Sequence, residues 1–143
     1  MLKVLLPVDG SKSATRATRM LVKSVAWYKV LPQIDLLAVH LPVPRFPNMG
    51  LAVSDEMIER YYAEECKAML KASRKILDAG DMKYTVHTAV GSIAEKIIEQ
   101  AKRSRSDMIY MGTRGMTALS NMVMGSVTTR VLHLAHIPVV LVH

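Results

Sequence analysis

Three of the seven glycines lie close together in the last third of the chain. Gly112, Gly115 and Gly125 fall within fourteen residues, and Ser126 follows the last of them, which gives the pattern G-x2-G-x9-G-S. Because glycine lacks a Cβ atom, its amide can approach an anion closely and can take positive φ. The pattern therefore predicts a loop whose main chain binds a phosphate group. The alternative is that these glycines only make turns, since glycine is common in loops.

A helix that begins directly after this loop would add to the anion site. The first amides of a helix have no partner within it and lie at its positive end, so those of Ser126, Val127 and Thr128 could surround a phosphate. Arg114 adds a cation between the first two glycines, and no acidic residue follows Asp107. The alternative is that Ser126 only caps the helix.

Asp9 closes the first apolar run and directly precedes Gly10. A carboxylate at the end of a strand can accept a hydrogen bond from a ribose hydroxyl or help to hold Mg²⁺ beside phosphates. Aspartate before glycine is also a common turn former. Both interpretations of Asp9 stay open at this point.

Other catalytic and metal patterns are missing from the sequence. The segment Gly10-Ser11-Lys12-Ser13 lacks the first glycine of a P-loop, and neither G-x-G-x-x-G nor the nucleophile elbow G-x-S-x-G occurs. His133 and His136 have no carboxylate or thiolate near them in sequence, so they do not predict a zinc site. Cys66 is interpreted as a small packed residue. We therefore assign no catalytic residue.

Apolar runs alternate with helical patterns along the chain. Strands are expected at residues 2–8, 34–40, 82–88, 107–111 and 138–142. Helices are expected from residue 14 towards Pro32, from 54 to 78, from 92 onward, and over 126–135. The strands are continuous apolar runs, which is typical of a parallel sheet covered by helices on both faces. We therefore predict that residues 1–143 form one α/β domain, a three-layer sandwich with about four helices.

Local signals mark where these helices begin and end. Ser54 has the residue type of an N-cap, and Gly80 has that of a C-terminal stop. Ser92 and Glu95 have the spacing of a capping box. Three prolines within residues 42–47 exclude helix and central strand, so residues 42–50 are expected to form a loop.

The chain is basic, with 19 Lys and Arg against 12 Asp and Glu, a net charge of +7 and a pI near 9.7. This balance favours anionic partners. No acidic residue occurs between Asp9 and Asp35, and four basic residues in that stretch share one helical face: Lys12, Arg16, Arg19 and Lys23. The face could track phosphates, or it could be only a solvated surface. Aromatic residues do not interleave it, which argues against a platform that stacks single-stranded nucleic acid, and we do not expect nucleic acid as the main partner.

The single cysteine and the short apolar runs bear on location. Cys66 cannot form an internal disulfide, which fits a reducing cytoplasm. No apolar run approaches the roughly 18 residues of a membrane span. We expect a cytoplasmic protein that does not contact a membrane.

Three segments match one known family. They are the opening Leu5-Leu6-Pro7-Val8-Asp9-Gly10-Ser11, the glycine spacing from Gly112 to Ser126, and the ending from Val131-Leu132 through Ile137-Pro138-Val139-Val140. On these motifs the whole chain resembles the universal stress protein family, and its intact glycine pattern resembles the ATP-binding subgroup. The resemblance implies a five-stranded parallel sheet of order 3-2-1-4-5. It also implies an adenine nucleotide, usually ATP, between the first and fourth strands.

The resemblance also implies roles for residues at matching positions. Pro7, Val8 and Asp9 would wall the base and ribose, and the Val39 backbone would contact adenine. The phosphates would be held by Gly112, Arg114, Gly115, Gly125, Ser126, Val127 and Thr128. Mg²⁺ bound with ATP would involve Asp9. AMP or cyclic AMP are alternatives, because the adenine contacts are largely backbone.

In this strand order the segment Pro138 to Val142 would be an exposed apolar edge. A two-fold partner could pair with it in antiparallel fashion, so we expect a homodimer through this strand. The leading hypothesis is an ATP-binding stress protein that senses nucleotide with at most slow hydrolysis. The alternative is a nucleotide-independent module that docks an acidic partner.

Overall fold

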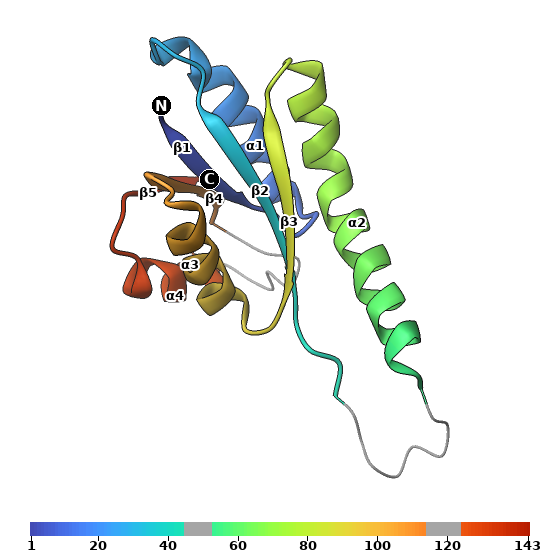
Figure 1. Ribbon diagram of the computed structural model, residues 1–143. Helices are drawn as coiled ribbons and strands as arrows, with labels where there is room; N and C mark the ends of the chain where they lie inside the picture. Colours follow the sequence, from blue (N-terminus) through green and yellow to red (C-terminus); the bar gives the residue numbers. More distant parts are fainter. Residues whose placement is uncertain (45–52, 114–123) are drawn as a thin grey trace.

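A computed structural model describes residues 1–44, 53–113 and 124–143 of the chain (Figure 1). In these ranges strands and helices alternate. The elements are β1 (Lys3–Pro7), α1 (Lys12–Ser24), a 3₁₀ turn (Val25–Trp27), β2 (Gln33–His40), α2 (Asp55–Ala79), β3 (Tyr84–Val90), α3 (Ile93–Ser104), β4 (Met108–Gly112), α4 (Ser126–Leu134) and β5 (Val139–Val142).

The five strands form one parallel sheet of order β3-β2-β1-β4-β5. Helices α1 and α2 cover one face, and α3 and α4 cover the other (Figure 1). The predicted three-layer α/β fold and its strand order are confirmed. The order reverses between β1 and β4, where parallel sheets of this class bind ligands at the carboxyl ends of the strands.

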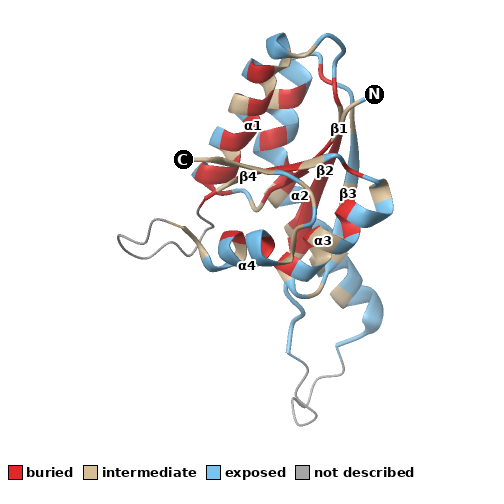
Figure 2. Cartoon of the chain, turned by 90° about the vertical axis from the view of Figure 1, so that its left-hand side faces the viewer, coloured by how far each residue is buried: buried red, intermediate tan, exposed pale blue. Residues whose placement is uncertain are grey.

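Neighbouring residues of the central strands enter two separate cores. Val4 and Leu6 of β1 pack with residues of α1 and α2, whereas Leu5 packs with Ile97 of α3 on the other face. All four side chains are buried. Figure 2 shows this burial along β1, β2 and β4. Because both faces are covered, the strands need an unbroken apolar run rather than an alternating one.

The first helix is shorter than its sequence pattern predicts. Helix α1 ends at Ser24 and continues only as the 3₁₀ turn, instead of running towards Pro32. The buried Ser24 hydroxyl donates to the Leu21 carbonyl at 2.8 Å, and the Tyr28 amide donates to Val25 at 3.1 Å. These contacts tighten the last turn and stop the α-helical ladder.

The third strand begins later than predicted, at Tyr84 rather than Met82. After α2, Asp81 takes positive φ (52°) and the amide of Met82 donates to the Leu77 carbonyl at 3.0 Å. The Met82 side chain is buried in the α1–α2 core. Residues 80–82 therefore close the end of α2, and the strand starts where it pairs with β2.

The capping box predicted at the start of α3 is not formed in its usual geometry. Ser92 is the N-cap, as predicted, but its hydroxyl donates to the Glu95 carboxylate instead of accepting from a backbone amide. Arg130 of α4 pairs with the same carboxylate at 2.9 Å. The hydrogen bond from Ser92, followed by that from Arg130, lowers the pKa of Glu95. The carboxylate thus links α3 to α4.

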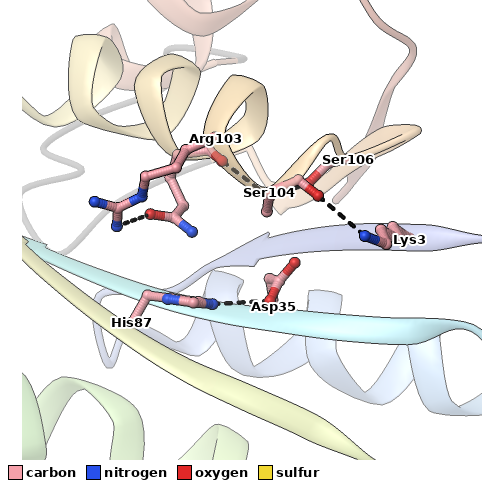
Figure 3. A network of polar contacts seen from close by, with 7 residues as sticks. Lys3, Asp35, His87, Arg103, Ser104 and Ser106 are labelled. Atoms are coloured by element: carbon pink, nitrogen blue, oxygen red, sulfur yellow. Dashed lines mark hydrogen bonds and ion pairs between the residues drawn. The ribbon is translucent and has the colours of Figure 1, made fainter.

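A polar cluster lies under α3, near the amino ends of the strands (Figure 3). The buried Asp35 carboxylate of β2 lies 2.8 Å from His87 Nε2 of β3. Above them the Ser104 hydroxyl donates to the Gln100 carbonyl at 2.9 Å, and Lys3 Nζ donates to the Ser104 carbonyl at 3.4 Å. The Asp35–His87 pair thus joins β2 to β3, and the Lys3 contact joins the end of α3 to β1.

We expect Asp35→Ala to lower the free energy of unfolding by about 1–3 kcal/mol, because it leaves the half-buried His87 imidazole without its partner. Asp35→Asn keeps an oxygen that can accept from the imidazole and should cost less. Urea denaturation of the two variants checks this order. Equal loss in both would mean that the carboxylate charge, and not the hydrogen bond, stabilises the pair.

Cys66 is buried against the sheet, and burial raises the pKa of its thiol, with a smaller contribution from Glu65. We expect a thiol reagent such as DTNB to modify the folded protein at least about 100-fold more slowly than the urea-unfolded chain. Equal reaction rates of the folded and the unfolded chain would contradict this expectation.

The pKa of the Cys66 thiol is higher in the folded protein than in the unfolded chain. The contribution of this thiol to stability is therefore present at neutral pH and declines above about pH 8.5.

Candidate functional site

A cavity opens at the carboxyl ends of β1, β2 and β4, between the sheet and the helices α3 and α4. Its lining residues are Pro7, Val8, Asp9, Ala14, Leu37, Val39, Ile93, Ile97, Met111, Gly112, Val127 and Thr128. Parallel strands end at the same edge of a sheet, so residues from separate parts of the chain meet around this cavity. The cavity lies at the reversal of strand order.

Most of the site residues expected from the sequence lie in this lining. They are Pro7, Val8, Asp9, Val39, Gly112, Val127 and Thr128. Gly125 and Ser126 lie at the start of α4 but do not line the cavity itself. Arg114 and Gly115 lie outside the described residues.

The apolar wall of the cavity was not predicted from the sequence. Leu37 and Met111 reach it from strands, and Ile93 and Ile97 reach it from α3. The signal was present, since Leu37 and Val39 are two apart on one strand face and Ile93 and Ile97 are four apart on one helix face. Those spacings predict core packing equally well. Such a wall suits a flat apolar ring whose polar edge is met by backbone groups.

Helix α4 begins with its amides available to a ligand. Gly125 is the N-cap (φ −72°, ψ 161°) and has no side chain that could accept from the helix. Its own amide donates to the Thr113 carbonyl at 2.6 Å, and the first intrahelical bond runs from the Thr129 amide to the Gly125 carbonyl at 3.1 Å. The amides of the first three helical residues, 126–128, therefore have no partner within the helix.

Thr128 ties the start of α4 to the end of β4. Its side chain is buried, and its hydroxyl donates to the Gly112 carbonyl at 3.2 Å. The hydroxyl is thus used within the protein, and the amide is the group of Thr128 that can address an anion.

The end of β4 packs directly against the start of α1. A Cβ atom at Gly112 would lie 2.7 Å from the backbone carbon and oxygen of Ser13 and would also overlap the Ser13 hydroxyl. Glycine is therefore required here by helix packing. The glycine spacing predicts the approach of a phosphate here, and the contact with Ser13 is a second reason for glycine at this position.

Asp9 forms the turn between β1 and α1. Its Oδ1 accepts from the Ser11 amide at 2.9 Å, and Gly10 takes positive φ (81°). The Ser11 hydroxyl then caps α1 by accepting from the Ala14 amide at 3.1 Å. The turn-forming interpretation of Asp9 is therefore borne out, and the residue also lines the cavity.

Within the described parts of the chain, no group of three or more His, Cys, Asp or Glu could hold a metal ion. Asp9 is the one acidic residue in the cavity lining. A divalent cation at this site would therefore depend on the phosphates of a bound ligand together with Asp9. In the same described ranges, no helix is long and apolar enough to cross a bilayer.

Comparison with known proteins gives a consistent result. The model of the Universal stress protein family matches residues 1–143. Universal stress protein MJ0531 of Methanocaldococcus jannaschii is 30% identical over 142 residues, which cover 98% of this chain and 81% of that protein. The solved structure of MJ0577 from the same organism superposes with a TM-score of 0.80 at 26% identity, covering 99% of this chain and 94% of that one.

More distant structures share the fold and hold adenine nucleotides. A universal stress protein solved in complex with cAMP has a TM-score of 0.70 at 18% identity, covering 99% of this chain and 97% of that one. Others were solved with dAMP, from Archaeoglobus fulgidus, and with AMP, from Arabidopsis thaliana. At such identities these likenesses establish the fold alone.

Proposed function

The chain belongs to the universal stress protein family, and from this premise we propose that it binds an adenine nucleotide in the cavity at the carboxyl ends of β1, β2 and β4. ATP is the proposed ligand. The nucleotide acts as a signal in a stress response and is turned over slowly or not at all.

One observation carries this proposal: an apolar cavity meets the free amides of a helix start at the reversal of strand order. Val39 and Ile93 offer the apolar wall that an adenine ring needs. The amides of residues 126–128 form an anion site at the positive end of α4. Pro7 ends β1 and Val8 and Asp9 follow it, and these three lining residues would contact the sugar.

The choice among adenine nucleotides rests on the loop before α4. The spacing G-x2-G-x9-G-S supplies more amides than one phosphate can use, which favours ATP. We assign phosphate contacts to Gly112, Arg114, Gly115, Gly125, Ser126, Val127 and Thr128. AMP and cyclic AMP are the alternatives, and the cAMP, dAMP and AMP complexes of distant relatives support adenine as the base.

Isothermal titration of the purified protein tests the proposal, together with mass spectrometry of any small molecule that it releases on denaturation. We expect heat on ATP addition, or ATP released from the protein. If neither ATP, AMP nor cyclic AMP gives heat or raises the melting temperature, the proposal is wrong. The nucleotide-independent module would then be the better interpretation.

The role of Asp9 is separable by two substitutions. Asp9→Asn keeps an oxygen that can accept from the Ser11 amide, whereas Asp9→Ala removes it. If Asp9 also holds Mg²⁺, we expect Asp9→Asn to keep the stability of the wild type and its ATP affinity without Mg²⁺. Its ATP affinity in the presence of Mg²⁺ should be about tenfold weaker than that of the wild type. An unchanged effect of Mg²⁺ would restrict Asp9 to the turn. Calorimetry with and without Mg²⁺ measures the difference.

We also propose a homodimer through β5. This strand ends the sheet next to β4, and its four residues are all half-buried valine or leucine. An antiparallel strand from a second copy would satisfy its open edge. Analytical ultracentrifugation at micromolar concentration should give twice the 15.9 kDa chain mass, and a monomer would contradict the proposal. The cytoplasmic location remains a prediction.

A further inference from the structure

The outer face of α1 is basic along its whole length. Lys12, Arg16, Arg19 and Lys23 are all exposed. Among the described residues none of the four takes part in an ion pair or a side-chain hydrogen bond. We call this surface the cationic face. Because no carboxylate neutralises it, it attracts anionic partners.

Helix α2 runs beside α1 in the same direction, and its basic residues form a second surface separate from the cationic face. The hydroxyls of Thr18 and Ser73 are 2.8 Å apart, and Gly10 and Gly80 approach Met69 and Val22 respectively. The second surface carries the exposed residues Lys67, Lys71, Arg74 and Lys75, and Arg74 Nε donates to the Tyr84 hydroxyl of β3 at 3.4 Å, away from α1.

Two acidic groups lie at the ends of this part of α2. Glu64 is at one end and Asp78 is at the other. Asp78 Oδ1 accepts a hydrogen bond from the Tyr84 hydroxyl at 2.7 Å, so this oxygen is already engaged within the protein. The basic residues between them outnumber these acids.

The stripe on α1 ends on exposed apolar side chains. Trp27 is the last residue of the 3₁₀ turn that directly follows α1. Its side chain is 71% exposed, and those of Val30 and Leu31 are 63% and 56% exposed. We call residues 27–31 the apolar tip. Lys29 within it is also exposed, and the tip contains no acid.

The cationic face begins at Lys12, near the nucleotide site, and runs away from it along α1, whereas the apolar tip lies at the opposite ends of the strands. The apolar tip directly precedes β2, and the amide of Gln33 donates to the Leu2 carbonyl at 2.9 Å. The tip therefore lies at the amino edge of the sheet, whereas the cavity lies at the carboxyl edge.

We propose that the cationic face and the apolar tip form a docking surface for an anionic phospholipid membrane, which departs from the sequence-based expectation of no membrane contact. Basic residues on an amphipathic helix are attracted to anionic headgroups, and tryptophan prefers the membrane interface. A nucleic acid would use the cations, but it would gain nothing from exposed Val30 and Leu31. The charge pattern and the aliphatic side chains together therefore favour lipid. The contact is peripheral, with Trp27, Val30 and Leu31 in the interface.

The chain contains one tryptophan, so its fluorescence reports directly on the apolar tip. At low salt, we expect vesicles of phosphatidylcholine with roughly 30 mol% phosphatidylglycerol to shift Trp27 emission to the blue. The protein should also sediment with these vesicles. Pure phosphatidylcholine vesicles should do neither. Binding should weaken as salt is raised, because the attraction is screened.

Three variants test the surface by sedimentation with the anionic vesicles. Arg16→Glu with Arg19→Glu should weaken partitioning by at least about 25-fold, since each basic residue contributes about fivefold. Trp27→Ala should weaken it by about tenfold through loss of apolar burial. Lys102→Glu with Arg105→Glu is the matched control, because it changes the net charge by the same amount and both residues are exposed at the end of α3, on the other side of the sheet. It should bind vesicles like the wild type.

The outcomes separate the proposal from its competitors. A blue shift that depends on phosphatidylglycerol and is lost in the double charge reversal on α1 supports it. Equal loss in the control with Lys102→Glu and Arg105→Glu would mean only net-charge attraction and would overturn the docking surface. Binding of an oligonucleotide with no vesicle binding would also overturn it. ATP titration of the double variant on α1 should remain normal, so failure here is distinct from failure of the nucleotide proposal.

Discussion

Gly125→Asp is expected to abolish nucleotide binding while the protein stays folded. Gly125 is the N-cap of α4 with φ −72° and ψ 161°, an extended conformation that any residue adopts. An aspartate there would accept from the free amides at residues 127 and 128, and its charge would repel a phosphate. We expect ATP affinity to fall at least about 100-fold, because two charge-assisted hydrogen bonds of about 1.5–3 kcal/mol each are lost.

The same substitution should not destabilise the fold. Aspartate is a better N-cap than glycine by a few tenths of a kcal/mol, so the melting temperature without nucleotide should stay the same or rise slightly. This separates loss of a binding site from loss of structure. Calorimetry with ATP and a thermal melt of the unliganded protein measure both quantities.

Two further variants make the result specific. Gly125→Asn offers the same hydrogen bonds to the helix without the charge, and should lose less affinity than Gly125→Asp. Ser54→Ala removes the N-cap bond to the Met57 amide at the start of α2 and should cost about 1 kcal/mol of stability with no effect on ATP binding. If Gly125→Asp binds ATP as the wild type does, the phosphates are not held by α4.

The fold was predictable because its main signal is local. Leu5 and Leu6 are adjacent and both buried, one in each core, and only a sheet covered on both faces requires that arrangement. The capping residues Ser54 and Gly80 at the two ends of α2 are equally local signals. The order of the strands came from the family resemblance, since apolar runs alone do not state which strands are neighbours.

Element ends were less predictable because tertiary contacts set them. Helix α1 stops where Ser24 turns back to Leu21, and β3 starts where it can pair with β2, after Met82 has been taken into the core. No pattern within either segment encodes these contacts. The hydrogen bond of the Ser92 hydroxyl also depends on a tertiary contact. Its acceptor Glu95 is held by Arg130 of α4, which lies 35 residues away in the sequence.

The glycines of the site could be predicted from the sequence, but its apolar walls could not. Glycines and Asp9 stand out in a sequence, whereas Leu37 and Ile93 have the spacing of ordinary core residues. What distinguishes them is an open space at one edge of the sheet, which only the packed structure has. A glycine can also have two roles at once, and Gly112 shows the role that spacing does not reveal.

Gly112→Ala is expected to destabilise the protein by about 2–3 kcal/mol, with a fall in melting temperature of roughly 5–10 °C. The added methyl group would lie 2.7 Å from the backbone carbon and oxygen of Ser13, so α1 must move away from the end of β4. The measurement is made without nucleotide, because Gly112 also lines the cavity. A melting temperature within 1–2 °C of wild type would mean that α1 yields easily there, since cores tolerate small shifts at a low cost.

A pair of double variants identifies the cause. At Gly80 the corresponding Cβ atom would meet a side-chain methyl, Val22 Cγ1, at 2.8 Å, so Val22→Ala should largely rescue Gly80→Ala. At Gly112 the closest unavoidable neighbours are backbone atoms, which no substitution removes. Ser13→Gly should therefore fail to rescue Gly112→Ala. If it does rescue the variant, the side-chain contact rather than the backbone contact demands glycine at the end of β4.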